Sequence, residues 1–130
     1  KVEVEIRKSY YKSGALYSET PYVNGDKHGI ARSYYESDVL MWESPYVNGD
    51  RHGLVKGYYE SGVLERETPY EAGEIHGLVK GYYKSGALIR KTPYLNGEKH
   101  GLEKLYDKDR ADIELLVLYK EGQIITSIKI

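Results

Sequence analysis

The sequence predicts an all-β fold, an elongated and twisted single-layer antiparallel meander built from about five β-hairpin repeats of 24 residues. Three observations lead to this prediction. Residues recur along the chain with a period of 24, and each period holds two turn signals. No segment spaces its apolar residues as an amphipathic helix does over three turns. We therefore expect one repeat domain over residues 1–130, with about ten or eleven short strands.

The period is carried by several residue types at once. Tyrosine recurs at Tyr10, Tyr34, Tyr58, Tyr82 and Tyr106. Pro-Tyr pairs begin at Pro21, Pro45, Pro69 and Pro93, and His-Gly pairs begin at His28, His52, His76 and His100. Such self-similarity indicates a repeat array, in which each unit contacts only its neighbours.

The ends of the array are expected to differ from its middle. We expect an N-terminal cap strand at 1–5, repeats at about 6–29, 30–53, 54–77 and 78–101, and a degenerate capping repeat at 102–130. The alternation of Val2, Val4 and Ile6 predicts the first strand. The last repeat lacks the Pro and the His-Gly pair, and its tail is strongly apolar. It is therefore expected either to fold over the sheet or to hold a second copy of the chain as a homodimer.

Each of the first four repeats contains two turn signals and one proline. The first turn is Tyr-Tyr-Lys/Glu-Ser-Gly, in which a residue such as Gly62 adopts a positive φ and Asp38 takes the equivalent place. The second is Asn-Gly, the strongest short hairpin signal, replaced once by Ala72-Gly73. Because proline cannot donate to a central ladder, Pro69 and its equivalents are expected at a strand end or a bulge.

Alternation along the third repeat assigns side chains to the two faces of the sheet. If the first turn pairs Tyr58 with Leu64, one face carries Leu54, Lys56, Tyr58, Leu64, Arg66, Thr68 and Tyr70. The other face carries Val55, Gly57, Tyr59, Val63, Glu65 and Glu67. We predict that the first, Leu- and Tyr-rich face is the packed one, although a slip of one residue would exchange the two.

Composition excludes several classes of protein. The chain has 19 Lys and Arg against 20 Asp and Glu, so it lacks the basic excess of a nucleic-acid binder. It has no Cys, which excludes disulfides, Cys-ligated zinc and a Cys nucleophile. No apolar run is long enough to span a membrane. The first residue is Lys1 rather than Met, which is consistent with a removed signal or upstream segment, so the compartment stays open.

We expect no catalytic residue, no metal and no cofactor, and hence no enzyme. The four repeated histidines lie one unit, roughly 10 Å, apart, which is too far to share one metal ion. They are expected instead to order their corners by a hydrogen bond or by packing. A serine that recurs four times in the same turn is expected to stabilise that turn rather than to act as a nucleophile. The paired carboxylates Glu65 and Glu67 are expected to be a solvent-exposed row of charges rather than the acid pair of a glycosidase.

Two rows of side chains are candidates for binding. The candidate partner-binding residues are the exposed aromatics Tyr11, Tyr35, Tyr59 and Tyr83, together with Trp42, the only Trp. The equally weighted alternative is that these rings only shield neighbouring strands. The candidate anionic-surface residues are Lys8, Arg32, Lys56, Lys80 and Lys104. The favoured alternative for them is cross-strand pairing with the acid row Glu19, Glu43 and Glu67.

The unit Tyr-Tyr-x-Ser-Gly-x-Leu, followed by Thr-Pro-Tyr-x-Asn-Gly-x-x-His-Gly-Leu, resembles the bacterial variant of the MORN repeat from Ile6 to about Gly122. The resemblance implies a meander of hairpins and a non-enzymatic module. It also implies contacts with proteins, dimerisation or phospholipid binding, and the bacterial variant recurs in antitoxin and immunity proteins. We therefore expect a protein partner, most specifically a toxin, with a scaffold or an anionic membrane surface as the alternative.

Overall fold

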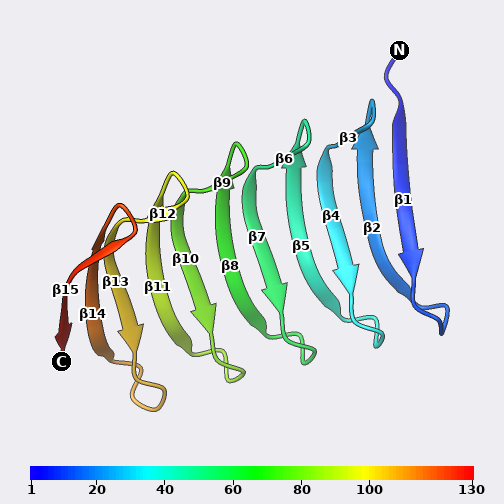
Figure 1. Ribbon diagram of the computed structural model, residues 1–130. Helices are drawn as coiled ribbons and strands as arrows, with labels where there is room; N and C mark the ends of the chain where they lie inside the picture. Colours follow the sequence, from blue (N-terminus) through cyan, green and yellow to red (C-terminus); the bar gives the residue numbers. More distant parts are fainter.

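The computed structural model describes all 130 residues as one open antiparallel sheet of 15 strands (Figure 1). The eleven strands that form its body are ordered as in the chain, β1-β2-β4-β5-β7-β8-β10-β11-β13-β14-β15, and the four short strands pair beside them. The layer is bowed, and the two ends of the chain lie at opposite ends of the sheet (Figure 1). The predicted fold class is confirmed. None of its elements is a helix that could cross a membrane.

From β2 to β14 the strands repeat in a fixed pattern of eight, two and six residues, and β1 and β15 at the ends have seven each. The first half contains β1 (Val4–Tyr10), β2 (Leu16–Val23), β3 (Asp26–Lys27), β4 (Gly29–Tyr34), β5 (Leu40–Val47), β6 (Asp50–Arg51), β7 (Gly53–Tyr58) and β8 (Leu64–Glu71). The second half contains β9 (Glu74–Ile75), β10 (Gly77–Tyr82), β11 (Leu88–Leu95), β12 (Glu98–Lys99), β13 (Gly101–Tyr106), β14 (Ile113–Lys120) and β15 (Gln123–Lys129).

The Asn-Gly turns adopt the backbone that the sequence predicts. Asn48 has φ 48° and Gly49 has φ 91°, so both central residues are in the left-handed region, as a type I′ hairpin turn requires. Ala72 adopts the same conformation, with φ 50°, although it lacks the side-chain amide that makes this region accessible to Asn. The first turn also behaves as predicted, since Gly62 and Asp38 both have positive φ.

The prolines lie inside strands, and the expectation of a strand end or a bulge was wrong. Pro69 lies within β8 and pairs with Leu54 of β7. Its carbonyl accepts the backbone N–H of His76 at 3.0 Å. On that side β8 changes partner, from β10 at Glu67 to the short strand β9 at Tyr70. The missing N–H of proline therefore falls in the gap between two partners, where the ladder does not use it.

A β-bulge in every long hairpin decides the faces. Tyr58 pairs with Leu64 as predicted, but the next pair is Gly57 with Arg66, so Glu65 is an extra residue. The extra residue moves Arg66, Thr68 and Tyr70 to the opposite face from the one predicted. We call the side that carries Val55, Val79 and Val117 the valine face, and the side that carries Lys8, Lys56 and Lys80 the lysine face.

The packed face is the valine face, which corrects the prediction that the Leu54 side would be packed. The eight buried residues all lie on the valine face: Ser44, Val55, Gly57, Thr68, Val79, Thr92, Glu103 and Val117. On the lysine face Leu54, Leu78 and Leu102 stay 39 to 44% exposed. The reason is that the bulge places Thr68 and Tyr70 on the valine face, where the Trp42 ring also lies over Gly57.

Each histidine joins two repeats. The Nδ1 atom of His28 accepts the backbone N–H of Asn48 at 3.1 Å, and His52 does the same for Ala72 at 3.4 Å. Beside these bonds, the N–H of Gly49 donates to the carbonyl of Lys27 at 2.8 Å. The Asn-Gly turn of one repeat thus docks on the His corner of the preceding one, so the hydrogen bond is made between repeats and not only within a corner.

The strained turn residue Ala72 gives a test of this description. We predict that Ala72→Asn raises the free energy of unfolding by about 0.5–1 kcal/mol, because Asn tolerates the left-handed region better than Ala. Urea denaturation followed by circular dichroism measures the change. The control is Ala87→Asn, at a loop position without positive φ, which gains nothing. A destabilised Ala72→Asn variant would contradict the turn geometry.

Candidate protein-binding face

The predicted basic ladder lies on the lysine face, in one row with the acids. The row runs through successive strands as Lys8, Glu19, Arg32, Glu43, Lys56, Glu67, Lys80, Lys91 and Lys104. Arg32 Nε lies 3.2 Å from a carboxylate oxygen of Glu43. Charges therefore alternate over the first three repeats and cancel at short range. Only Lys91 breaks the alternation, which leaves three neighbouring lysines without an acid between them.

The predicted tyrosine row joins consecutive repeats. The hydroxyl of Tyr11 donates to the carbonyl of Tyr34 at 2.7 Å. The hydroxyls of Tyr35 and Tyr59 donate in the same way, at 2.6 Å, to the carbonyls of Tyr58 and Tyr82. Desolvation raises the pKa of both Tyr11 and Tyr35, with nearby acids adding to it. These phenols are therefore structural bridges whose rings remain half-exposed.

Tyr83 holds the fourth place in this row without such a bond. The carbonyl that would correspond to the acceptor belongs to Tyr106, which leads into the longer turn 107–112. The row is thus anchored in its first three members and ends where the repeat becomes irregular.

Trp42 lies on the valine face, where it is 41% exposed. It pairs across the strands with Gly57, and its ring covers that glycine so closely that an added Cβ would lie 2.6 Å from it. Beside the ring is a hollow of about 350 Å³, lined by Trp42, Arg51, Val55, Arg66, Thr68, Tyr70 and Ile75. The tryptophan that the sequence marked as unusual therefore stands at the edge of a concavity.

A second tyrosine row, which sequence reasoning did not select, crosses the valine face. It consists of the tyrosines that follow the prolines and of Tyr119, which takes the equivalent place in the last repeat, and cations lie over several of the rings. The Arg7 guanidinium carbon lies 3.9 Å from the Tyr22 ring centre, and that of Arg51 lies 5.8 and 5.4 Å from Tyr46 and Tyr70. The ammonium groups of Lys27 and Lys99 take similar places over Tyr46 and Tyr119. The recurring Pro-Tyr pairs in the sequence indicate a row of tyrosines, but they do not show on which face of the sheet the rings lie.

The valine face is also basic. It carries Arg7, Arg51, Arg66 and Arg90, four of the six arginines in the chain. Two of its acids are already engaged. Glu5 pairs with Arg7 at 2.8 Å, and the buried Glu103 accepts hydrogen bonds from Thr92 at 2.5 Å and Tyr119 at 3.4 Å. The face thus combines aromatic rings with arginines, and no group of three or more His, Asp or Glu side chains on the molecule is arranged to hold a metal ion.

Comparison with known families agrees with this architecture. A family model described as the MORN repeat variant matches residues 6–24, 27–48, 51–72 and 75–96, which together make up more than half of the chain. The first matched segment begins with its repeat, the other three begin just before a repeat starts, and each ends at the first residue of the Asn-Gly turn or of its Ala-Gly equivalent. No curated protein matches the chain significantly.

The contact between Trp42 and Gly57 gives a direct test of the site. We predict that Gly57→Ala displaces the ring, shifts the emission of this single Trp and lowers stability by about 1–3 kcal/mol. Gly81→Ala is the matched control one repeat later, because its added Cβ would meet only Arg90, at an ordinary 3.8 Å. Fluorescence spectra and urea denaturation of both variants measure the difference. Unchanged emission in Gly57→Ala would show that the ring does not cover the glycine.

Proposed function

The chain belongs to the family of MORN repeat variants, and from this premise we propose that it binds a protein partner through its valine face. Repeats of this family generally serve as modules that bind proteins or membranes. The proposal is that this chain performs no chemistry of its own. Its effect on the partner comes from covering part of the partner's surface.

One observation carries the proposal. The valine face brings an exposed Trp42, half-exposed tyrosine rings and the arginines Arg66 and Arg90 onto one continuous surface. Trp, Tyr and Arg are the residues most enriched at the energetic centres of protein interfaces. Aromatic side chains supply a large contact area and lose little conformational entropy on binding. The hollow beside Trp42 offers room for an apolar group of the partner.

The most specific form of the proposal is an antitoxin or immunity role, in which the valine face covers the active surface of a toxin. A sheet that is already formed and tied between repeats by hydrogen bonds loses little entropy when it binds. Steric blocking requires only such a preformed surface with enough area.

A second candidate function, at an anionic membrane surface, is favoured by one feature. Lys80, Lys91 and Lys104 are cross-strand neighbours on the lysine face without an acid between them. The exposed Leu78 and Leu102 lie on the same face beside them. A scaffold role would instead use the edge strand β15, where Ile124 and Ile128 are 64 and 58% exposed, to meet a second copy of the chain.

Replacement of Trp42 tests the main proposal. A partner captured from the source cell and then purified should bind the Trp42→Ala variant at least about 30-fold more weakly, the loss expected of an interface hot spot. Ile30→Ala is the matched control, since Ile30 is 43% exposed but lies on the lysine face, and it should change the affinity less than twofold. The reverse order, or binding to phosphatidylserine vesicles with no protein partner, would contradict the proposal.

A further inference from the structure

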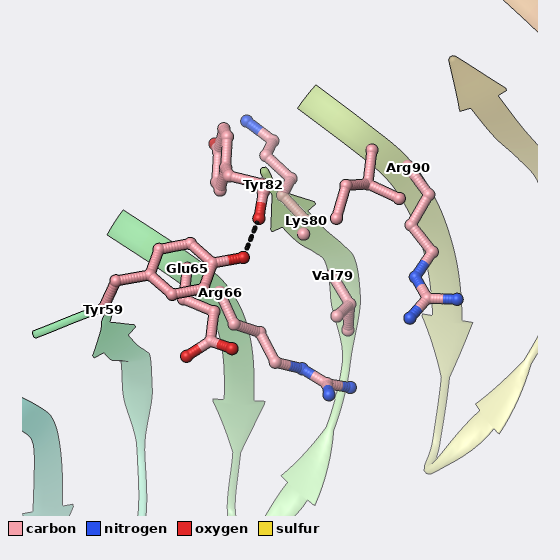
Figure 2. A pocket seen from close by; sticks show the side chains of 9 residues that line it. Tyr59, Glu65, Arg66, Val79, Lys80, Tyr82 and Arg90 are labelled. Atoms are coloured by element: carbon pink, nitrogen blue, oxygen red, sulfur yellow. Dashed lines mark hydrogen bonds between the residues drawn. The ribbon is translucent and has the colours of Figure 1, made fainter. Parts of the chain in front are cut away.

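We propose that the valine face contains a socket for an acidic side chain of the protein partner, located over Gly81 between Arg66 and Arg90. This inference rests on the proposed function and specifies the chemistry of the partner. The residues that form the socket come from three neighbouring strands, β8, β10 and β11 (Figure 2).

The register places the two arginines on either side of a residue that has no side chain. Gly81 pairs with Arg66 of β8 on one side and with Arg90 of β11 on the other. A Cβ built on Gly81 would meet nothing closer than the Arg90 side chain at 3.8 Å, so the space above it is open. The result is a hollow of about 120 Å³, floored by Val79, which is only 6% exposed.

The open hollow occurs in one repeat only. One repeat earlier, Gly57 occupies the position of Gly81, but the ring of Trp42 fills the space above it. One repeat later, Leu105 occupies that position and carries its own side chain. Arg66 takes the place of Trp42 in the next repeat and leaves the glycine uncovered. The socket is therefore a local departure from the repeat rather than a property of every unit.

The two guanidinium groups have no acidic partner within the chain. The ion pairs of the molecule join Arg7 to Glu5, Arg32 to Glu43, His76 to Glu71 and Arg110 to Asp107, and neither socket arginine takes part. Glu65 also lines the hollow, whereas the side chain of Lys80, whose backbone borders it, lies on the lysine face. In Figure 2 the side chain of Arg66 reaches from β8 towards Val79, and that of Arg90 extends along β11 on the other side of Val79. A negative group placed over Val79 would therefore meet two unpaired positive charges.

The size and chemistry of the hollow favour a carboxylate. Its volume equals that of roughly four water molecules, which suits the end of one side chain and not a cofactor. A guanidinium group matches the planar carboxylate with two parallel hydrogen bonds, and an apolar floor strengthens these bonds by limiting water. The side chain of Tyr59 closes the hollow at the end nearest to the Tyr-Tyr-Lys/Glu-Ser-Gly turn. An Asp or Glu side chain of the partner fits these features, with its methylene groups on Val79.

The test uses the whole chain and a hexaglutamate peptide, blocked at both ends, as the probe. In extended form the peptide spans the two strand spacings, about 10 Å, between the arginines. Binding at low salt is followed by amide NMR shifts, which should centre on Arg66, Gly81 and Arg90. The double variant Arg66→Gln/Arg90→Gln should bind about tenfold more weakly, since two exposed charge contacts are lost.

The matched control is Arg32→Gln/Lys56→Gln, which removes the same charge from the lysine face and should change the affinity less than twofold. NMR spectra of both double variants verify that the fold is retained. Absence of peptide binding, equal loss in both double variants, or shifts centred on Lys91 and Lys104 would overturn the proposal. So would binding to inorganic phosphate or phosphatidylserine vesicles in place of the peptide.

The purified partner separates this inference from the proposed function. If Trp42→Ala weakens the complex and Arg66→Gln/Arg90→Gln does not, the socket does not bind the partner, and the valine face remains the binding surface. If neither variant weakens the complex, the proposed function itself fails.

Discussion

A sheet of one layer has no second layer to pack on, so each repeat is held to the next by the pairing of their strands and by side chains that reach across. Only eight residues of the chain are buried, and three of them are valines in the middle of one face. Cohesion between repeats comes from the strand pairs and, in addition, from polar bridges, such as the Tyr35 hydroxyl on the carbonyl of Tyr58 and the His28 ring on the backbone of Asn48. The tyrosine keeps its ring on the sheet while its hydroxyl satisfies a carbonyl at the strand end.

The two faces of the sheet therefore have different roles. The lysine face carries alternating charges that neutralise one another along most of the row, which favours solubility over recognition. The valine face carries the bridging tyrosines, and between them it exposes Trp42 together with Arg51, Arg66 and Arg90. None of these three arginines forms an ion pair with an acid of the chain. Cohesion and recognition therefore use the same face. Replacing a bridging tyrosine would disturb both, whereas Arg66, which has no ionic partner in the chain, can be changed to probe recognition.

The period and the turn residues predicted the single layer, the eleven strands of its body and the positions of the turns, because those depend on neighbours in the chain, but they did not predict the four two-residue strands β3, β6, β9 and β12. The faces could not be predicted, because one bulge residue such as Glu65 moves every side chain beyond it in the strand to the opposite face of the sheet. Such a bulge does not change the 24-residue spacing. The pairing of Lys56 with Glu67 depends on the same register. The socket over Gly81 was also hidden, because Arg66 and Arg90 look like ordinary repeat positions until the strands place them around a glycine.

The contribution of the bridging hydroxyls to stability can be measured by removing one of them. Tyr59→Phe deletes a hydroxyl that donates to the carbonyl of Tyr82, whereas Tyr83→Phe deletes one at the same repeat position that makes no such bond. Urea denaturation, followed by circular dichroism and by Trp42 emission, compares the two. We predict that Tyr59→Phe lowers the free energy of unfolding by about 1 kcal/mol, the net value of one hydrogen bond, and that Tyr83→Phe leaves it unchanged. Equal losses in the two variants would contradict the view that these hydroxyls hold the repeats together.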